Sequence, residues 1–242
     1  MSQLGHFGKG LFIAKAQNKV AVVSRRRPPV RKEIKNVKKS IRKIQSNDEL
    51  KHNDTSGGLN PATAGNFRLL NGVAQSAGAS TDTTRIGDDV NATSIQLKGY
   101  VQADGTITSS STDVARSVRV ILFWDQQANG GTPTLAQLLD LSVVTDGTQA
   151  PYNDNNQKRF KILKDKIFAV NPFYFVGATN VADTRTFLRF KWKLSRKVKY
   201  IGTTGLIASI GTNALWLVTI TDSTANANQP VADIGTRFIF KD

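Results

Sequence analysis

The sequence predicts an all-β domain, a single eight-stranded antiparallel jelly roll of two packed sheets, behind a basic N-terminal arm that is partly helical or disordered. After residue 65, short apolar or alternating segments recur between polar loops, with very little helical periodicity. Before residue 48 the chain is rich in Lys and Arg and poor in apolar residues. We therefore divide the chain into an arm (1–47), a linker (48–65) and a β domain (66–242).

The strands are assigned from their periodicity. Residues 94–101 alternate between apolar and polar, as a half-buried strand does. Residues 117–124 (SVRVILFW) and 214–221 (ALWLVTIT) are nearly continuously apolar, which indicates central strands buried on both faces. A short helix over 134–140 is expected to begin at a Thr134 cap. Further strands are predicted at 66–71, 159–170, 185–194 and 237–241.

The strand at 185–194 has two different faces. One face carries Leu188, Phe190, Trp192 and Leu194, and we expect Trp192, like Trp124 and Trp216, to pack in the core. The other face is basic. Its stripe is composed of Arg189, Lys191 and Lys193, extended by Arg196, Lys197 and Lys199. This stripe either lines the interior of an assembly or is an ordinary solvated sheet face.

Charge is distributed very unequally along the chain. Residues 1–47 contain 13 Lys/Arg and one acidic residue, Glu33, for a net +12. Residues 48–242 contain the other 20 Lys/Arg and 17 Asp/Glu, for a net +3. So concentrated a basic block favours nucleic acid as the partner. The residues expected to contact phosphate are Arg25, Arg26, Arg27, Arg31, Lys32, Lys35, Lys38, Lys39, Arg42 and Lys43.

Within the arm, residues 31–45 have a helical pattern. Ile34, Val37, Ile41 and Ile44 are spaced 3, 4 and 3 residues apart, which places them on one stripe of a helix. A helix of about 15 residues is marginal in water without a partner. The stripe therefore indicates either a helix that forms against a partner, a copy of itself or the β domain, or a transient helix in a flexible arm.

Several classes of function lack the residues they need. The chain has no cysteine, and its two histidines, His6 and His52, lie outside the predicted β domain, so His- or Cys-based catalysis is not expected and we predict no enzyme. No apolar run approaches the roughly 18–20 residues of a membrane span, so no membrane partner is expected. No cofactor or metal ligand is assigned, and an inter-subunit Ca²⁺ site stays an open alternative.

An ordered set of segments resembles one protein family. The segments lie at 67–72, 85–88, 118–130, 151–153, 159–168, 213–222 and 237–242. In this order they are similar to the single jelly-roll capsid (coat) proteins of small circular single-stranded DNA viruses, and to satellite tobacco necrosis virus-like coat proteins. The resemblance covers roughly residues 66–242, and the arm matches only in its basic character.

The resemblance implies a viral capsid protein that self-assembles, with on the order of 60 copies in a small icosahedral shell. It also implies a packaged single-stranded genome, for which we favour DNA over RNA, and a place in the virion. The Arg25–Arg27 run beside two prolines is typical of a nuclear localisation signal, so we expect assembly in the host nucleus. The alternative is a basic-tailed nucleic-acid-binding protein that condenses nucleic acid without assembling.

Overall fold

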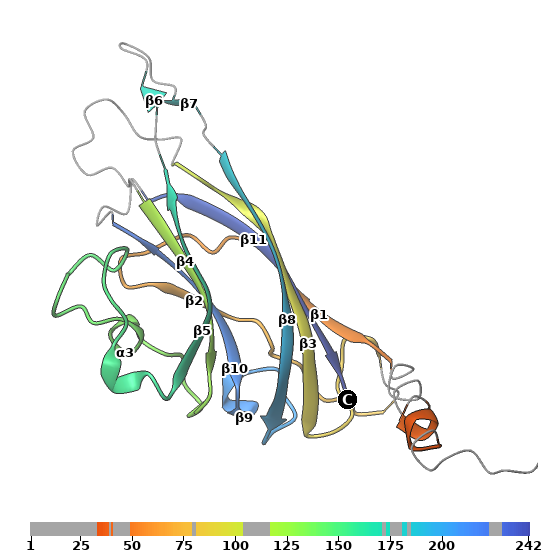
Figure 1. Cartoon of the computed structure of the whole chain (residues 1–242). Coiled ribbons are helices and arrows are strands. Elements are labelled where there is room, and N and C mark those ends of the chain that lie inside the picture. The colour runs from red at the N-terminus through yellow and green to blue at the C-terminus, as the bar shows by residue number, and fades with distance from the viewer. Residues whose placement is uncertain are drawn as a thin grey trace, which may run out of the picture. The chain divides into compact units, whose positions relative to one another are not determined.

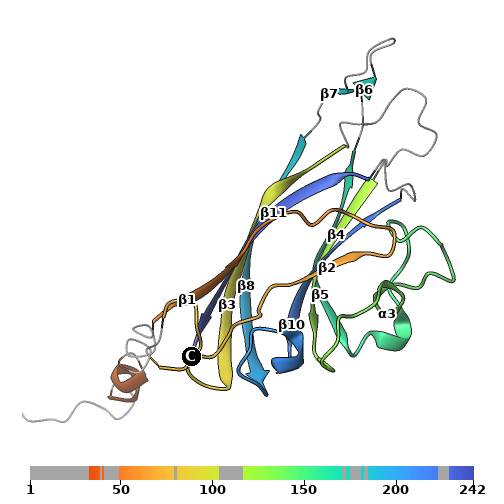
Figure 2. The ribbon, with the colours of Figure 1, turned by 180° about the vertical axis from the view of Figure 1, so that it is seen from behind.

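The computed structural model describes residues 33–38, 40, 49–78, 81–103, 117–170, 173–174, 181–182, 185–222 and 229–242. The chain forms two compact units, Met1–Asp48 and Glu49–Asp242. The second unit is built of β-strands in two antiparallel sheets, which Figures 1 and 2 show from opposite sides.

Each sheet combines strands from distant parts of the sequence. The first sheet has the order β1 (Lys51–Thr55), β11 (Val231–Lys241), β3 (Asp89–Gln102), β8 (Arg185–Tyr200) and β9 (Ile210–Thr212). The second has the order β2 (Asn66–Leu69), β10 (Ala214–Thr221), β4 (Ser117–Asp125) and β5 (Phe160–Ala169). The remaining elements are α3 (Leu135–Leu138), the pair β6 (Phe173–Tyr174) and β7 (Val181–Ala182), and 3₁₀ turns at Asp154–Asn156 and Ile207–Ser209.

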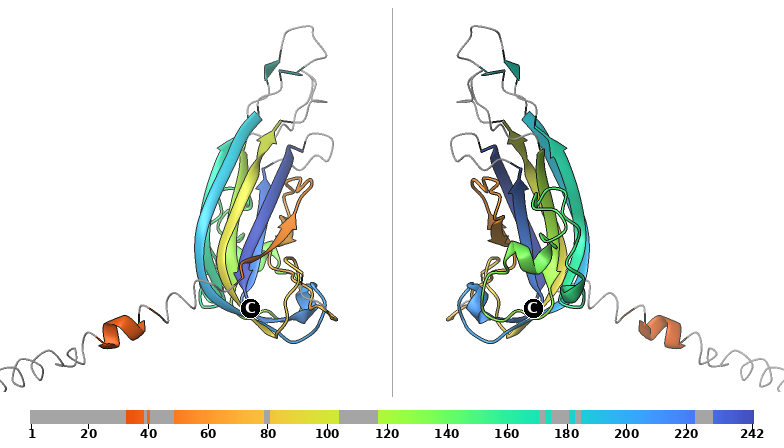
Figure 3. Two further views of the ribbon diagram at one scale, coloured as in Figure 1. Left: turned by 90° about the vertical axis from the view of Figure 1, so that its right-hand side faces the viewer. Right: turned by 90° about the vertical axis from the view of Figure 1, so that its left-hand side faces the viewer.

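The strand order is that of a jelly roll. Among the eight principal strands, every connection crosses from one sheet to the other, except the one from β4 to β5. This alternation wraps the chain around a single core, so the predicted all-β jelly roll is confirmed. Figure 3 shows β8, β3 and β11 side by side in one layer.

Burial follows the sequence pattern closely. Each residue of β10 is buried, and in β4 only the first residue is not, because both strands have neighbours on either side and a layer over each face. In β3 and β11, by contrast, alternate residues are buried. The apolar residues of both sheets join in one core cluster. The helix predicted over 134–140 forms only in part, as α3: it ends at Leu138, and Leu139 is extended and pairs with Tyr152. Thr134 is its N-cap, and the Thr134 N–H donates to Gln137 Oε1 at 3.1 Å.

The predicted linker is wrong at Lys51–Thr55, which forms β1. The segment has no apolar alternation, but it lies at a sheet edge and is held by pairing with β11, from Lys51 opposite Phe240 to Thr55 opposite Thr236. Polar side chains add to this pairing: Lys51 is buried against Asp242, and Asn53 donates to the Gly72 carbonyl oxygen. Partners almost 190 residues away in the sequence therefore make the strand, and no local signal reveals them.

The expectation that all three tryptophans lie in the core is wrong for Trp192. Trp124 and Trp216 are buried, but the Trp192 side chain is 39% exposed. It has the same parity along β8 as buried Leu188 and Leu194, as predicted. However, β9 pairs with β8 only at Lys199 and Tyr200, so within the described part of the chain no further strand covers the edge at Trp192.

In the arm unit, residues 33–38 and 40 are helical and exposed, which agrees with the described part of the helix predicted over 31–45. No helix among the described residues is long and apolar enough to span a membrane.

Gly99 allows β3 and β11 to approach closely. A Cβ atom there would overlap the Asp233 carbonyl oxygen and lie 2.8 Å from Ile234 Cα, both in the backbone of β11. We expect Gly99→Ala to lower the free energy of unfolding by about 1–3 kcal/mol, because the strands would have to separate. Chemical denaturation measures the change. Gly131→Ala is the control, since nothing lies within 4 Å of its Cβ position; equal effects of the two substitutions would contradict the prediction.

Candidate nucleic-acid interface

The outward face of the first sheet concentrates basic residues on β3 and β8. Alternation sends Leu97 and Val101 into the core, so Lys98 and Tyr100 point outward. Figure 1 shows the two strands running side by side. The outward pairs, directly opposite each other across the two strands, are Tyr100–Phe187, Lys98–Arg189, Gln96–Lys191, Ser94–Lys193, Asn91–Lys197 and Asp89–Lys199. We call this surface the β3–β8 face.

The cations in the middle of this face lack acidic partners. Among the described residues, no carboxylate lies within 4 Å of Lys98, Arg189, Lys191 or Lys193. Lys98 and Arg189 stand directly opposite each other, and like charges in that position destabilise a sheet. Further along β8, Lys197 is neutralised by Asp89 at 2.9 Å. The uncompensated positive charge is therefore in the middle of the face.

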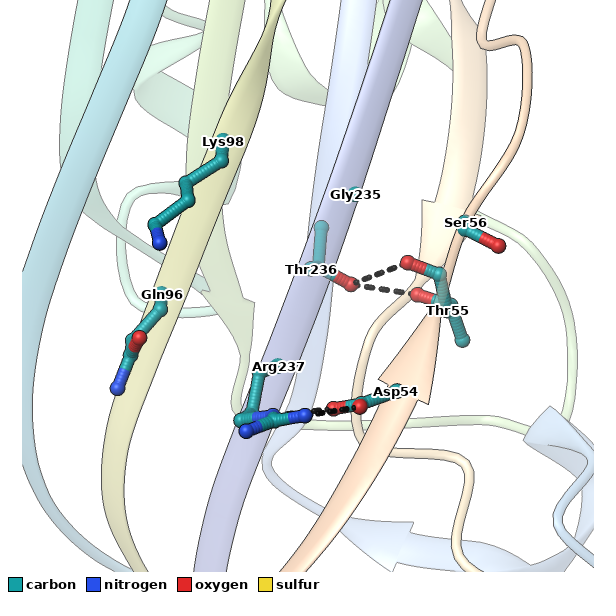
Figure 4. Close-up of a pocket in the computed structure, with 8 residues that line it drawn as sticks. All are labelled: Asp54, Thr55, Ser56, Gln96, Lys98, Gly235, Thr236 and Arg237. Carbon is teal, nitrogen blue, oxygen red and sulfur yellow. Dashed lines mark hydrogen bonds and ion pairs between the residues drawn. The ribbon is translucent and has the colours of Figure 1, made fainter.

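An open hollow of about 340 Å³ extends the face over β11 and β1 (Figure 4). Its floor includes Gly235, which lies opposite Lys98 and has no side chain to fill the space. Gln96 and Lys98 extend from β3 on one side, and Asp54 of β1 lies on the other. The hollow therefore gives an approaching ligand access to Lys98.

Arg237, at the border of the hollow, is already occupied. Its guanidinium donates to both oxygens of Asp54, at 2.8 and 2.6 Å. This side-chain hydrogen bond and the guanidinium charge lower the pKa of Asp54, so the carboxylate stays ionised and holds the arginine. Lys98 is therefore the cation in the hollow that is free to meet an anion, whereas the Asp54–Arg237 pair ties β1 to β11.

Aromatic side chains lie at one end of the face. Phe187 is 75% exposed, and its ring meets that of Tyr100 edge-on, with centroids 6.5 Å apart. The Arg185 guanidinium lies 4.9 Å from the centre of the Tyr100 ring. Tyr100 and Lys98 are not among the residues predicted from the sequence. Their alternation with the apolar Leu97 and Val101 was nevertheless enough to place them on the outward face.

Arg196 does not belong to the predicted basic stripe. Its parity is that of Leu194 and Val198, and its Nη1 atom donates to Gln126 Oε1 at 2.8 Å and to Asn213 Oδ1 at 2.9 Å. Those partners lie at the ends of strands of the second sheet, so Arg196 joins the two sheets. Arg189, Lys191, Lys193, Lys197 and Lys199 are all exposed on the outward face, as predicted.

Most of the predicted arm site lies outside the described residues. Of the ten cations, Lys35 and Lys38 are described, and both are exposed on the helical segment. Ile34 and Val37, from the predicted self-association stripe, are 49% and 57% exposed. The residues outside the described ranges are Arg25, Arg26, Arg27, Arg31, Lys32, Lys39, Arg42, Lys43, Ile41 and Ile44.

No three metal-ligating side chains gather anywhere in the described part of the chain. An inter-subunit Ca²⁺ site would involve a second copy of the chain and stays untested.

A jelly-roll domain with a basic face, preceded in the sequence by a strongly basic arm, is typical of viral coat proteins. Comparison with known proteins is in agreement: the family described as Satellite tobacco necrosis virus coat protein matches residues 16–242. The chain belongs to this family, and it is therefore a structural protein rather than an enzyme. It is 30% identical over 171 residues to the capsid protein of Satellite tobacco necrosis virus 1. The aligned region covers 69% of this chain and 74% of that protein.

Among solved structures, the 60-mer BFDV capsid protein is similar over 79% of this chain and 90% of that chain. The two are 8% identical, with a TM-score of 0.24.

Replacing Lys98 tests whether the β3–β8 face carries uncompensated repulsion. We expect Lys98→Gln to raise the free energy of unfolding by about 0.2–1 kcal/mol at low salt, because it removes the like charge opposite Arg189. The gain should disappear in high salt, which screens the repulsion. Denaturation at two NaCl concentrations measures both. The control is Lys161→Gln, an exposed lysine opposite Trp124 on the second sheet; the same gain there would show that the effect is not local.

Proposed function

We propose that copies of this chain assemble into a closed icosahedral shell that packages a single-stranded viral genome through the basic arm. The observation that carries the proposal is the division of charge. A net +12 on residues 1–47 is attached to a jelly-roll coat domain whose net charge is only +3. The nearly neutral domain is suited to form the capsid shell, and the arm is suited to neutralise the phosphates of a genome. We therefore propose that the protein is a component of the virion.

The charge on the arm is large enough to matter for packaging. A closed shell on the order of 60 copies would bring together roughly 700 positive charges from its arms. Binding to phosphates releases counterions and needs no recognition of bases, so any sequence can be packaged. The arm contains only two aromatic residues, Phe7 and Phe12, so charge rather than base stacking should dominate its binding.

The arm helix supports a second part of the proposal, that arms associate with one another. Ile34 and Val37 lie three residues apart, on one side of the described helical segment, and both are exposed. A stripe left exposed in one copy can be buried by its equivalent in other copies. We propose that Ile41 and Ile44 continue the stripe, so that clustered helices present Lys35 and Lys38 to phosphate.

The alternative function is a nucleic-acid-condensing protein that does not assemble, and solution size separates the two. DNA as the genome, nuclear localisation through Arg25–Arg27 and a copy number near 60 stay predictions. RNA is the competing genome type, and extraction of the packaged nucleic acid followed by DNase and RNase digestion would decide between them.

Neutralising the arm tests the proposal on the full-length chain. We expect wild-type protein to form uniform spherical particles by negative-stain microscopy, with a 260/280 nm absorbance ratio typical of nucleoprotein. Replacing the ten arm cations named above by Gln should lower that ratio strongly towards that of protein alone, because the phosphates lose most of their counterions.

The matched control compares two triple variants: Arg25→Gln/Arg26→Gln/Arg27→Gln should lower the ratio, whereas Lys158→Gln/Lys161→Gln/Lys166→Gln, at exposed domain positions outside the β3–β8 face, should keep it high. Wild-type protein that stays small while carrying nucleic acid would favour the condensing alternative. A high ratio in particles of the arm variant would show that the arm does not package the genome.

A further inference from the structure

We propose that the β3–β8 face is a second binding site for single-stranded nucleic acid. In this site Lys98, Arg189, Lys191 and Lys193 bind the phosphodiester backbone, and the Tyr100–Phe187 pair stacks on a base. The proposed function assigns packaging to the arm; this site lies in the folded domain and depends on that proposal only for the identity of the ligand.

The positive charge in the middle of the β3–β8 face is not compensated by nearby carboxylates among the described residues. Lys98, Arg189, Lys191 and Lys193 have no carboxylate within 4 Å among the described residues, although the chain pairs Lys197 with Asp89 on the same face. A sheet selected only for stability would not place Lys98 directly opposite Arg189. An anion lying between these two side chains would remove the repulsion, and a polyanion can do so along the whole row.

The spacing of the cations on β8 matches the repeat of a single strand. Arg189, Lys191 and Lys193 are alternate residues of β8, so they repeat every 6.8 Å or so along the strand. That distance is close to the phosphate-to-phosphate repeat of an extended single strand. Successive phosphates can each meet one cation of β8, while Lys98 approaches from β3 and the hollow over Gly235 leaves that side open.

The aromatic pair Tyr100–Phe187 lies at the end of the row of β8 cations. The Phe187 side chain is 75% exposed, which leaves part of its ring free for a base. Tyr100 supports the ring edge-on, with centroids 6.5 Å apart, and Arg185 covers Tyr100 at 4.9 Å. An exposed aromatic side chain beside a basic groove is the arrangement by which proteins bind single strands without reading their sequence.

A second copy of the chain fits this face less well. The same face on another copy would bring uncompensated cations together, and the only acidic residues that point outward here are Asp54, Asp89 and Asp233 among the described residues. Asp54 and Asp89 are already paired with Arg237 and Lys197. The charge of the face thus favours an anionic polymer.

Photocrosslinking on the full-length protein tests the site. The probe is single-stranded oligo(dT) containing 5-iododeoxyuridine, which crosslinks to aromatic side chains stacked on it, with oligo(U) containing 5-iodouridine as the RNA counterpart. We expect mass spectrometry to locate crosslinks at Tyr100 or Phe187, in addition to any in the arm. The yield at these two residues should fall at least about tenfold between low and high salt, as expected for phosphate contacts.

The triple variant Arg189→Gln/Lys191→Gln/Lys193→Gln should lose the crosslinks at Tyr100 and Phe187 while keeping the oligonucleotide binding that the arm provides, measured by filter binding. The matched control, Lys158→Gln/Lys161→Gln/Lys166→Gln, removes the same charge from exposed positions near and on β5 and should keep both the crosslinks at Tyr100 and Phe187 and the filter binding. As single substitutions in the otherwise wild-type chain, Phe187→Tyr should preserve the crosslink at position 187 and Phe187→Leu should abolish it. Leucine fills the space but cannot stack on a base.

The outcomes separate the two proposals. Oligonucleotide binding without crosslinks at Tyr100 or Phe187 would overturn the second site and leave the proposed function standing, whereas no binding of the oligonucleotide by the full-length chain would contradict both. Domain crosslinks unaffected by the triple variant would overturn the phosphate contacts. If Phe187→Leu changes the assembly state of nucleic-acid-free protein, the face is a contact between copies and the proposal is wrong.

Discussion

The structure depends on the face-to-face burial of its two sheets, because each sheet must give one face to the common core. In β3 and β11, alternate side chains therefore point into the core; Ile95, Leu97, Ile234 and Phe238 are examples, and all four are fully buried. The intervening positions are left for water and are free to carry charge. The β3–β8 face is therefore a direct consequence of the core: the residues that stabilise the sandwich determine which cations project outward together.

The long crossings of a jelly roll need anchors, and buried charged groups provide them here. Arg119 of β4 donates to both oxygens of Asp165 and to the carbonyl oxygens of Gly147 and Ala150, so it holds a connecting loop against β5. Tyr152 donates to the same carboxylate, and burial together with Asp165 raises the pKa of its hydroxyl. These groups keep the loops in place because a buried charge without partners would be costly.

Arg85 is a comparable anchor elsewhere in the domain. Its side chain is fully buried, donates to the carbonyl oxygens of Val73, Gly87 and Gly202, and lies over the Tyr200 ring at 4.2 Å. Residues 85–88 belong to the segments that resemble the coat-protein family, and the structure gives this motif a physical role. It joins the turn that follows it to the nearby backbone at Val73 and to Gly202, which is 117 residues away in the sequence.

Composition and local period alone predicted the division of charge between arm and domain, the central strands β4 and β10, and the face on which most residues of β8 lie. Tertiary structure decided the rest. Lys51–Thr55 became a strand through β11, Arg196 turned to Gln126 and Asn213, and Trp192 stayed exposed at an uncovered edge. The opposition of Lys98 to Arg189 likewise arises only when β3 pairs with β8. Each of these outcomes depends on which distant strand lies alongside, and that pairing leaves no periodic signal in the sequence.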